Sequence, residues 1–558
     1  WSTRRLDVRS VFLDIVWSAG KCHRQIGFPE GLQYPTLLKK RMRVRLCVPL
    51  FLTFRQNVPL CRRSIAIAKV CENSQEWREA KPFSEIPGPK ELPLIKGVLW
   101  YFDFDGFGRE RLTQMHRKNY KTYGEIWRLP KVPFLKDSMV VLHNPQAHAT
   151  VYQNEGRYPN RNFFRSVKVY RDRNPQKYIN AGVVAENGKE WHSIRSKVQP
   201  FFLKKSLLGH HISSLDEVSL DFVNMISTLL DQNQETTDFI KDLYKWALES
   251  IATVALDTRL GCLDANTSSD SEAFLMISAV NQLFHSMSEV EIGIPLYKIY
   301  NTKEWKEFCA ASDTLARIGM KYINKKMETL DRSEPGNYST ILEGLLSVEG
   351  LDQSVALVTV LDMLGAGIDT TSHAMGFLLY HLGNNQEVQD RMFHEISKEL
   401  PHPSSPITKA NLENLKYVKA AIRESMRISP VVDTGSRIVE CDLIIHGYQI
   451  PKGTVCLLHQ SVTSNSTEYF DDPDKFLPER WLKTMDNKAK PNAYTTLPFG
   501  HGPRMCIGRR IADMEMWLLT IRLLQRFRVE YHHEPIQRIQ RIVGLPDRPL
   551  RLQFHQRY

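Results

Sequence analysis

The stretch Pro498-Phe-Gly-His-Gly-Pro-Arg-Met-Cys-Ile-Gly-Arg-Arg510 contains three glycines and two prolines within thirteen residues. These residues impose a specific tight loop, because proline fixes φ and glycine admits backbone angles that other residues avoid. A helical pattern begins directly after Gly508, so Cys506 lies just before a helix N-terminus. Free N–H groups and the helix dipole stabilise a thiolate there. Cys506 is therefore a candidate metal ligand or nucleophile, with a buried structural cysteine as the alternative.

Length and composition describe a globular protein. The chain has 558 residues, of which 42% are hydrophobic and 24% charged, and its mean hydropathy is −0.34. These values exclude wholesale disorder, a coiled-coil rod and a polytopic membrane protein. Nine cysteines are too few for a disulfide scaffold. The length predicts one very large domain or two ordinary ones.

The positive charge is concentrated at the N-terminus. Residues 1–80 contain 15 Lys or Arg and 6 Asp or Glu, a net charge of +9, which leaves +3 of the total +12 for the rest of the chain. The remaining body is nearly neutral, so the charge does not predict a nucleic-acid partner.

The N-terminal 80 residues have the composition of a targeting leader. Between Leu38 and Cys71 there are nine basic residues and no acidic one, which is typical of an organelle transit peptide. The longest apolar run, Leu46–Phe54, is far shorter than the roughly 20 residues of a membrane span. A secretory signal fits less well, because basic residues continue past that run. The first methionine is Met42, which predicts that 1–41 is upstream translated sequence and 42–80 the transit peptide.

The body from residue 81 to 558 is predicted to be mainly α with small β-sheets, and not a doubly wound α/β protein. Strand patterns are expected at Ile126–Leu129, Met139–Leu142 and within 431–460. In the last segment, Gly447 and a Pro-Lys-Gly sequence predict turns between strands. Helical periodicity predicts helices over 107–123, 206–232, 237–258, 305–330, 353–382, 385–399 and 411–428, and after Gly508.

The cysteine loop resembles the haem-binding loop of the cytochrome P-450 family in its pattern Phe499-x-x-Gly502-x-Arg504-x-Cys506-x-Gly508. The resemblance implies a haem b whose iron is ligated by the Cys506 thiolate. It also implies that Phe499 packs beside the sulfur and that Arg504 pairs with a haem propionate. By the same resemblance, Gly502 and Gly508 let the backbone lie against the porphyrin.

A long helical stretch carries the second signature, Leu361-Asp-Met-Leu-Gly-Ala-Gly-Ile-Asp-Thr-Thr371. Each glycine in a helix costs about 1 kcal/mol relative to alanine, so Gly365 and Gly367 predict a close approach to the backbone. A membrane span is disfavoured by the ionisable residues within it, and back-bonded helix threonines are the plain alternative. The segment resembles the family's oxygen-activating helix, which implies that Thr370 and Asp369 handle dioxygen and protons.

Two further sets of residues complete the resemblance. Glu424 and Arg427 are three apart on a helix, and Arg480 lies in Phe-Leu-Pro-Glu-Arg-Trp. They resemble the family's Glu–Arg–Arg lock, which implies a structural role. Trp191 and Arg195, four apart on one helix face, are implied to contact a haem propionate, and Arg437 is implied to do the same. A stacked indole–guanidinium pair is the plain alternative for Trp191 and Arg195.

A basic stripe precedes Glu424. Lys416, Lys419 and Arg423 fall on one side of an ideal helix. The stripe resembles the ferredoxin-docking residues of mitochondrial family members, with Arg509 and Arg510 adding to the same face. A solvated helix face is the alternative. The sequence from Cys506 onward also resembles invertebrate mitochondrial members and the vitamin D 24-hydroxylase group.

The resemblance covers residues 81–558 and implies a single large domain with haem between the oxygen-activating helix and the helix after the cysteine loop. It implies a monooxygenase that inserts one oxygen atom into a C–H bond of a small lipophilic substrate. Electrons would come from NADPH through a ferredoxin reductase and a [2Fe-2S] ferredoxin. The implied location is the matrix side of the mitochondrial inner membrane, as a peripheral protein. A haem-thiolate isomerase or lyase and a non-catalytic haem-binding protein are the alternatives.

The substrate itself is not encoded in a recognisable motif. The family varies its pocket walls, here expected in the loop 162–182 and in helices near 275–300. Phe164, Val167, Phe284 and Met287 are candidate pocket residues, with ordinary core residues as the alternative. Steroid, secosteroid, ecdysteroid-like and xenobiotic substrates all stay open.

Overall fold

The computed structural model describes residues 74–89, 111–130, 138–204, 209–264, 267–268, 270–292, 295–329, 338, 340–482 and 492–557. The chain divides into two units, Trp1–Ala66 and Ile67–Tyr558, and everything below concerns the second. The predicted transit peptide and the Met42 start lie outside the described residues, apart from the last few residues before 81. Both stay predictions.

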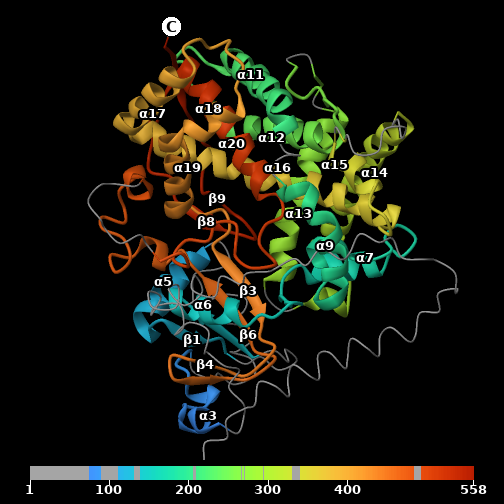
Figure 1. The fold of residues 1–558 in the computed structure, drawn as a ribbon, viewed down its shortest axis with the longest axis vertical. Coiled ribbons are helices and arrows are strands. Elements are labelled where there is room, and N and C mark those ends of the chain that lie inside the picture. Colours follow the sequence, from blue (N-terminus) through green and yellow to red (C-terminus); the bar gives the residue numbers. More distant parts are fainter. Residues whose placement is uncertain are drawn as a thin grey trace, which may run out of the picture. The chain divides into compact units, whose positions relative to one another are not determined.

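Helices make up most of the described body (Figure 1). Their bounds are α3 Gln75–Glu79, α5 Leu112–Tyr123, α6 Pro145–Gln153, α7 Arg165–Asp172, α8 Gly182–Ala185, α9 Gly188–Leu203, α11 Ile212–Leu229, α12 Phe239–Leu256, α13 Glu272–Glu291, α14 Lys303–Glu328, α15 Ile341–Leu346, α16 Gln353–Asn384, α17 Gln386–Glu399, α18 Lys409–Asn414, α19 Lys416–Ile428 and α20 Arg509–Arg526. The helices predicted over 237–258, 305–330, 353–382 and 385–399 are confirmed to within two residues at each end.

The helix predicted over 411–428 is wrong in one respect, because it breaks at Leu415 into α18 and α19. The first N–H groups of α19 need acceptors after such a break. Glu395 of α17 supplies them, since its carboxylate accepts from the N–H groups of Lys416, Tyr417 and Val418 at 2.9–3.0 Å. This contact comes from another helix, so the local sequence pattern does not show it.

The strands form small sheets, as predicted. Their bounds are β1 Ile126–Arg128, β2 Met139–Leu142, β3 Thr434–Ile438, β4 Leu443–Ile445, β5 Tyr448–Ile450, β6 Val455–His459, β7 Phe527–Glu530, β8 Arg538–Gln540, β9 Gly544–Pro546 and β10 Gln553–Gln556. The largest sheet has the order β1-β2-β6-β3, in which β2 and β6 are parallel and the other pairs antiparallel. The predicted strands are confirmed, whereas β7–β10 near the C-terminus were not predicted.

The helix α16 is the central element of the body. It packs against α12, α14, α19 and β7, and most of its side chains are buried on several sides. Among the described residues it is the one helix long and apolar enough to cross a membrane by length and composition. Yet 67% of its most apolar window is buried inside the protein, as in the core helix of a globular domain.

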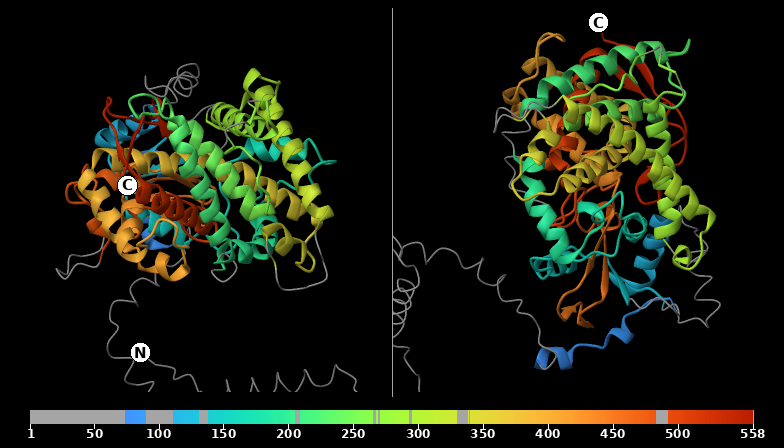
Figure 2. Two further views of the ribbon diagram at one scale, coloured as in Figure 1. Left: turned by 90° about the horizontal axis from the view of Figure 1, so that it is seen from above. Right: turned by 90° about the vertical axis from the view of Figure 1, so that its right-hand side faces the viewer.

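The two ends of the described body differ in structure. Figure 1 shows α11, α17 and α20 gathered at one end and β1, β3, β4 and β6 at the other. The helix α20 lies alongside α11, also in the view from above in Figure 2. A buried ion pair joins them, because Arg522 donates to both carboxylate oxygens of Asp216 at 2.6 Å. The helix that follows the cysteine loop is thereby fixed to the helical end.

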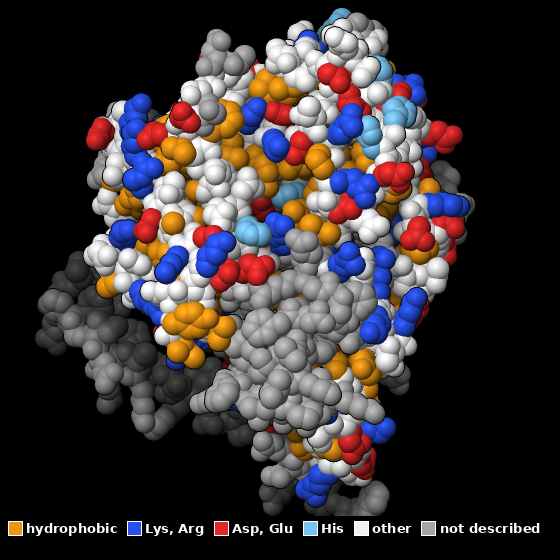
Figure 3. Space-filling model, turned by 180° about the vertical axis from the view of Figure 1, so that it is seen from behind, with side chains coloured by type: hydrophobic (Ala, Val, Ile, Leu, Met, Phe, Trp, Pro, Cys, Tyr) orange, Lys and Arg blue, Asp and Glu red, His pale blue; other side chains and the backbone are white. Residues whose placement is uncertain are grey.

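Residues just before the predicted domain start contact the sheet end. The side-chain amide of Gln449 in β5 donates to the Trp77 carbonyl at 2.7 Å, and its backbone N–H donates to the Lys81 carbonyl at 2.8 Å. These contacts place α3 against the body, and the leader boundary at residue 80 stays a prediction. Elsewhere on the described surface, basic and acidic side chains are interspersed on the face shown in Figure 3.

Candidate active site

A cavity of about 640 Å³ is lined by α16 on one side and by the cysteine loop, residues 498–508, on another. Its wall holds the predicted site residues Trp191, Arg195, Thr370, Arg437, Phe499, Arg504, Cys506 and Gly508. These residues come from α9, α16, β3 and the loop, which are far apart in the sequence. The fold therefore brings together eight of the ten residues predicted for catalysis, haem binding and iron ligation. The other two, Asp369 and Gly502, do not line this cavity.

The thiol of Cys506 faces the cavity from the end of a tight loop. The loop is closed by hydrogen bonds from the Cys506 N–H to the Phe499 carbonyl at 2.8 Å and from the Met505 N–H to the Gly502 carbonyl at 3.0 Å. Backbone N–H groups of Gly508 and Arg509 point at the sulfur and lower the thiol pKa, but burial is the larger effect and leaves the pKa raised. The predicted helix-terminus contacts are thus present.

The two glycines predicted to lie against the cofactor, Gly502 and Gly508, serve different purposes. Gly502 has a φ of +75°, and a Cβ there would lie 1.8 Å from a carboxylate oxygen of Glu155. The loop conformation and the Glu155 carboxylate therefore require glycine at this position. A Cβ on Gly508 would meet no heavy atom within 4 Å, so its backbone borders open space in the cavity wall, as the resemblance implies.

Guanidinium groups gather at the same cavity. Arg195, Arg437 and Arg504 are 5–8% exposed, and Arg161, which sequence reasoning did not single out, lines the cavity beside them. Burial lowers the pKa of Arg161 and of Arg195 to about 10. Burial and the other three guanidiniums lower the pKa of Arg504 to about 8. Such a concentration of buried positive charge is unfavourable unless anions compensate it.

The arginines are held by specific contacts. Arg504 lies over the Trp191 ring, with 4.4 Å from its Cζ to the ring centre, and donates to the Glu186 carbonyl at 2.6 Å. Arg195 donates to the Met505 carbonyl in the cysteine loop at 2.9 Å. Arg437 donates to Glu155 and to the His501 carbonyl. Trp191 therefore stacks on Arg504, and not on Arg195 as the plain alternative supposed.

These residues fit a planar, dianionic cofactor with an iron centre. The Nη1 atom of Arg504 and the Nε atom of Arg161 are buried and have no hydrogen-bond partner within the described ranges. Glu155 is already paired with Arg437. Two carboxylates entering the cavity would give the guanidiniums partners, and the Cys506 thiol would supply a sulfur ligand for the iron. The donor set suits haem.

Thr370 and Asp369 face different directions. The Thr370 hydroxyl borders the cavity and donates to the Ala366 carbonyl at 2.8 Å, so it is both back-bonded and accessible. The Asp369 carboxylate is 2% exposed and accepts from the Tyr244 hydroxyl at 2.7 Å, away from the cavity. Adjacent residues on a helix point about 100° apart, which explains the separation. In this structure the Asp369 carboxylate therefore does not border the cavity that the Thr370 hydroxyl faces.

The glycines of α16 allow close packing, as predicted. A Cβ on Gly367 would lie 2.9 Å from Ile251 of α12, and one on Gly365 would lie 3.1 Å from Leu315 of α14. The groups that approach the backbone are therefore neighbouring side chains. Both glycines also border the cavity.

Glu515 is a buried acid of the cavity wall that sequence reasoning missed. It lies on α20, is 2% exposed and is linked by a side-chain hydrogen bond to Thr371. Burial raises its pKa to about 8, so the carboxyl group is largely protonated at neutral pH. The sequence offered one indication of this position, because Glu515 follows Cys506 by only nine residues. A single glutamate in a helix, however, has no pattern that predicts a role in the site.

The predicted Glu–Arg–Arg residues do meet. The Glu424 carboxylate accepts from Arg427 at 2.8 and 2.9 Å and from Arg480 at 2.9 Å. Glu424 and Arg427 are 0% and 1% exposed. Arg427 also donates to the Ser464 carbonyl at 2.7 Å. The lock joins α19 to the segment that precedes the cysteine loop.

The basic stripe lies on the outer side of α19. The Lys419 ammonium is 4.4 Å from the Trp517 ring centre, and the Arg423 guanidinium is 3.9 Å from that of Trp481. Lys416 is exposed. Arg509 is close enough to lower the pKa of Arg423, after burial. The stripe is thus partly stacked on tryptophans, and is not simply a set of freely solvated side chains.

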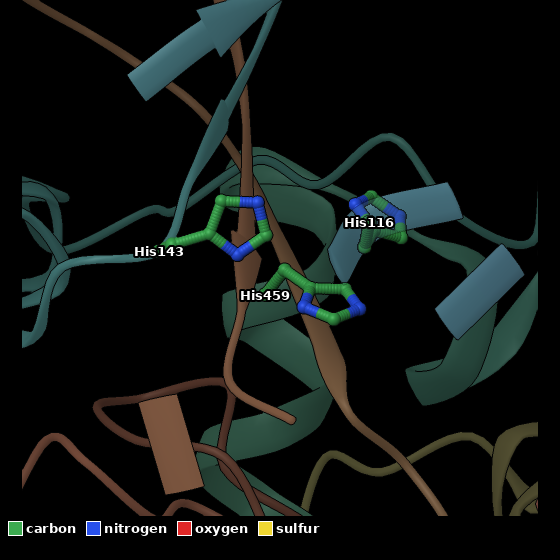
Figure 4. Close-up of side chains that lie close together, drawn as sticks. All are labelled: His116, His143 and His459. Carbon is green, nitrogen blue, oxygen red and sulfur yellow. The ribbon is translucent and has the colours of Figure 1, made fainter. Parts of the chain in front are cut away.

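Three buried histidines lie close together (Figure 4), and two of them, His116 and His459, line the cavity. The rings of His116, His143 and His459 each offer a nitrogen within 4.8 Å of the others. Burial holds the pKa of His116 and His143 well below 6.5. The Trp127 indole N–H already donates to His143 Nε2 at 3.0 Å, and an Arg538 guanidinium lies 3.1 Å from the neighbouring Asp433. Both contacts oppose a cation, and we assign no metal to this cluster.

The candidate pocket residues Phe164, Val167, Phe284 and Met287 all line the cavity. Phe164 has a φ of +65° at the start of α7, a left-handed conformation uncommon for a bulky residue. The walls near them are mainly apolar, which matches a lipophilic ligand.

The fold and the cavity define a haem-thiolate protein, and the comparisons agree. The family model of cytochrome P-450 matches residues 86–554, and the chain belongs to this family. It is 34% identical over 478 residues to a probable mitochondrial cytochrome P-450 12b2 of Drosophila melanogaster, covering 83% of this chain and 87% of the relative. It is 31% identical to the probable mitochondrial cytochrome P-450 301a1 of the same fly, covering 92% and 96%.

A third relative is the mouse mitochondrial 1,25-dihydroxyvitamin D(3) 24-hydroxylase, 31% identical over 480 residues, or 85% of this chain and 90% of the relative. The predicted resemblance to invertebrate mitochondrial members and to the 24-hydroxylase group is confirmed. The chain is a haem monooxygenase, an oxidoreductase, and the family binds haem through a cysteine thiolate.

Glu515 gives a prediction about stability. Its folded pKa of about 8 exceeds the usual 4.5, so the unfolded chain loses this proton first and stability falls as pH rises from about 4.5 to 8. We expect Glu515→Gln to raise the free energy of unfolding by about 1–3 kcal/mol at pH 7.5 and by little at pH 5. Unfolding in urea at both pH values measures this, with the exposed Glu534→Gln as control. An equal effect of Glu515→Gln at both pH values would contradict the prediction.

Proposed function

We propose that the protein hydroxylates a small lipophilic substrate at a C–H bond, with Cys506 as the haem-iron ligand. The observation that carries the proposal is the convergence of the Cys506 thiol, the Thr370 hydroxyl and a group of buried guanidiniums on one largely apolar cavity. Its volume of about 640 Å³ is within the range of small-molecule sites.

Bound haem supplies the redox chemistry that activates dioxygen and oxidises the substrate. The chain's own residues would hold it: Cys506 would supply the sulfur ligand, and Trp191, Arg195, Arg437 and Arg504 would contact its carboxylates. Phe499 would pack beside the sulfur, and the Arg509 guanidinium lies over the Phe499 ring, with 5.5 Å from its Cζ to the ring centre. The apolar wall excludes water, which strengthens the charge-assisted contacts inside.

Thr370 positions a proton in this proposal. Its hydroxyl donates to the Ala366 carbonyl, so its oxygen lone pairs face the cavity and can accept a hydrogen bond from a water or a ligand. Asp369 acts as the proton source only after its carboxylate leaves Tyr244 and turns toward the cavity. We therefore assign Thr370 the direct role and Asp369 a conditional one.

The Cys506 assignment has a spectroscopic test. We expect the chain from residue 74 onward to show a red-shifted Soret band when reduced and exposed to carbon monoxide, because a thiolate ligand produces that shift. Cys506→Ser should abolish the band, whereas Cys309→Ser, a half-buried cysteine outside the cavity, should keep it. A band typical of histidine ligation in the unaltered protein would overturn the assignment.

The Thr370 assignment has a kinetic test. We expect Thr370→Ala to retain haem but to lower product formed per NADPH consumed by about tenfold or more, with peroxide accounting for the difference. Ser372 is back-bonded on the same helix, donating to the Ile368 carbonyl at 2.6 Å, and does not line the cavity, so Ser372→Ala is a matched control. Unchanged coupling in Thr370→Ala would remove this residue from proton delivery.

The electron partners follow from the branch of the family. Several relatives are named mitochondrial, and we propose that this protein also acts in mitochondria, as a peripheral protein on the matrix side of the inner membrane. Electrons would then come from NADPH through a ferredoxin reductase and a [2Fe-2S] ferredoxin. The proposed docking surface is the stripe of Lys416, Lys419 and Arg423 with Arg509 and Arg510.

Docking of an acidic ferredoxin depends on the charge of this stripe. We expect the pair Lys419→Gln and Arg423→Gln to raise the apparent KM for ferredoxin about tenfold at low ionic strength, with a smaller difference at 0.3 M salt. The carbon monoxide spectrum should not change. The pair Lys241→Gln and Lys452→Gln removes the same charge from exposed positions elsewhere and serves as control. If the two double variants had the same KM for ferredoxin, the stripe would be an ordinary solvated helix face with no docking role.

A further inference from the structure

The cluster of His116, His143 and His459 is set apart from the Arg437 side chain by the four-stranded sheet. His116 belongs to α5, and its ring stacks on that of His459 at the end of β6, with 3.9 Å between the ring centres (Figure 4). Arg437 pairs with Cys456 in the register of β3 and β6. His459 follows Cys456 by three residues, and side chains alternate between the two faces of a sheet along each strand. The histidine cluster and the Arg437 side chain are therefore on different faces.

His116 is a buried imidazole with an unused hydrogen-bonding atom. Its side chain is 9% exposed and lines the active-site cavity. The Nδ1 atom has no hydrogen-bond partner within the ranges that the structure describes. Burial and the nearby His459 hold the ring pKa well below 6.5, so the ring is neutral and has one N–H donor and one acceptor nitrogen. A buried polar atom without a partner is unfavourable, which indicates that a ligand or a water molecule completes this site.

The residues beside His116 add polar atoms without an uncompensated charge. The Nδ1 atom of His459 likewise has no partner among the described residues, and its Nε2 atom lies 3.4 Å from a carboxylate oxygen of Asp433. The Asp433 side chain borders the cavity and lies 3.1 Å from the Arg538 guanidinium, which offsets its charge. The wall at this point therefore suits a neutral polar group better than an ion, because an ion here would be buried without a counter-charge.

The cavity wall around these polar atoms is apolar. It is formed by side chains that pack between α5 and the sheet, namely Leu112, Met115, Leu129, Ile292 and Leu457. These side chains would contact the hydrocarbon part of a ligand, while His116 contacts one polar group. A few polar atoms in a largely apolar wall are the usual means by which a pocket fixes the orientation of a small molecule.

We propose that His116, with His459 and Asp433 beside it, forms a specificity-determining site that binds a hydroxyl group of the lipophilic substrate. A hydroxyl both donates and accepts hydrogen bonds, so it pairs with His116 in either tautomer of the neutral ring. The substrate class is thereby narrowed to lipophilic alcohols, which the apolar wall and the imidazole hold in one orientation. The inference rests on the proposed function, because it concerns the substrate of the same cavity.

The test compares ligands that differ only in a hydroxyl group. Androstanol is paired with androstane and dodecanol with dodecane, and equilibrium dialysis measures their affinities for the haem-loaded enzyme. If His116 binds the hydroxyl, His116→Leu should weaken at least one of the alcohols about 5–10-fold relative to its hydrocarbon. His116→Asn keeps a donor and an acceptor and should retain most of this preference. Met115→Leu changes the shape of the same wall and should leave the alcohol-to-hydrocarbon ratio unchanged.

An alcohol-specific loss of affinity in His116→Leu supports the proposal. The proposal is overturned if Met115→Leu changes the ratio equally, or if His116→Leu leaves the ratio unchanged in both pairs; the partner of His116 is then a buried water molecule. His116→Phe, an aromatic ring without polar atoms, replaces the leucine variant should that variant not fold. Dialysis does not depend on the haem spectrum, so a thiolate-type carbon monoxide band in every variant shows that the proposed function stands whatever the ratio. Absence of the band in the unaltered protein would mean that the proposed function itself fails.

Discussion

The buried carboxylate of Glu424 is the contact on which the arrangement of the active site depends. It accepts from Arg427, from Arg480, from the Leu477 N–H at 3.1 Å and from the Trp481 indole at 2.8 Å. Its partners come from α19 and from a segment more than fifty residues later. A fully buried charge is tolerable only when it is paired and hydrogen-bonded in this way, and loss of one partner typically costs about 3–5 kcal/mol. The lock therefore sets the path of the chain toward the cysteine loop.

The second constraint is electrostatic and lies within the cavity. Several guanidiniums are buried around one space, and burial lowers the pKa of Arg504 to about 8. Backbone carbonyls and Glu155 satisfy part of these groups. The protein without a ligand therefore holds excess positive charge, and an anionic cofactor relieves it. Cofactor binding and folding of this region are thus linked, because a ligand that binds only the folded chain stabilises it.

The sequence predicted those features that depend on residue type at fixed spacing. The cysteine loop, the long helix α16 and the pairing of Glu424 with Arg427 are of this kind, since each is local or carries unusual residues. Contacts between distant segments could not be predicted. Glu395 capping α19, Glu155 requiring glycine at 502, and Tyr244 turning Asp369 away from the cavity all depend on the tertiary fold. Arg161 and Glu515 were missed because an isolated arginine or glutamate has no signature until burial gives it one.

Trp481 contacts both the proposed docking surface and the buried lock, and this has a physical consequence. Trp481 donates to Glu424 through its indole N–H, while its ring carries the Arg423 guanidinium at 3.9 Å. Stacking on a ring that is itself fixed reduces the conformational freedom of a long cationic side chain. The entropy lost when a partner immobilises that side chain is then smaller, which favours binding. A charged surface fixed to the core in this manner offers a partner a preorganised cation on α19, the helix that also carries the lock.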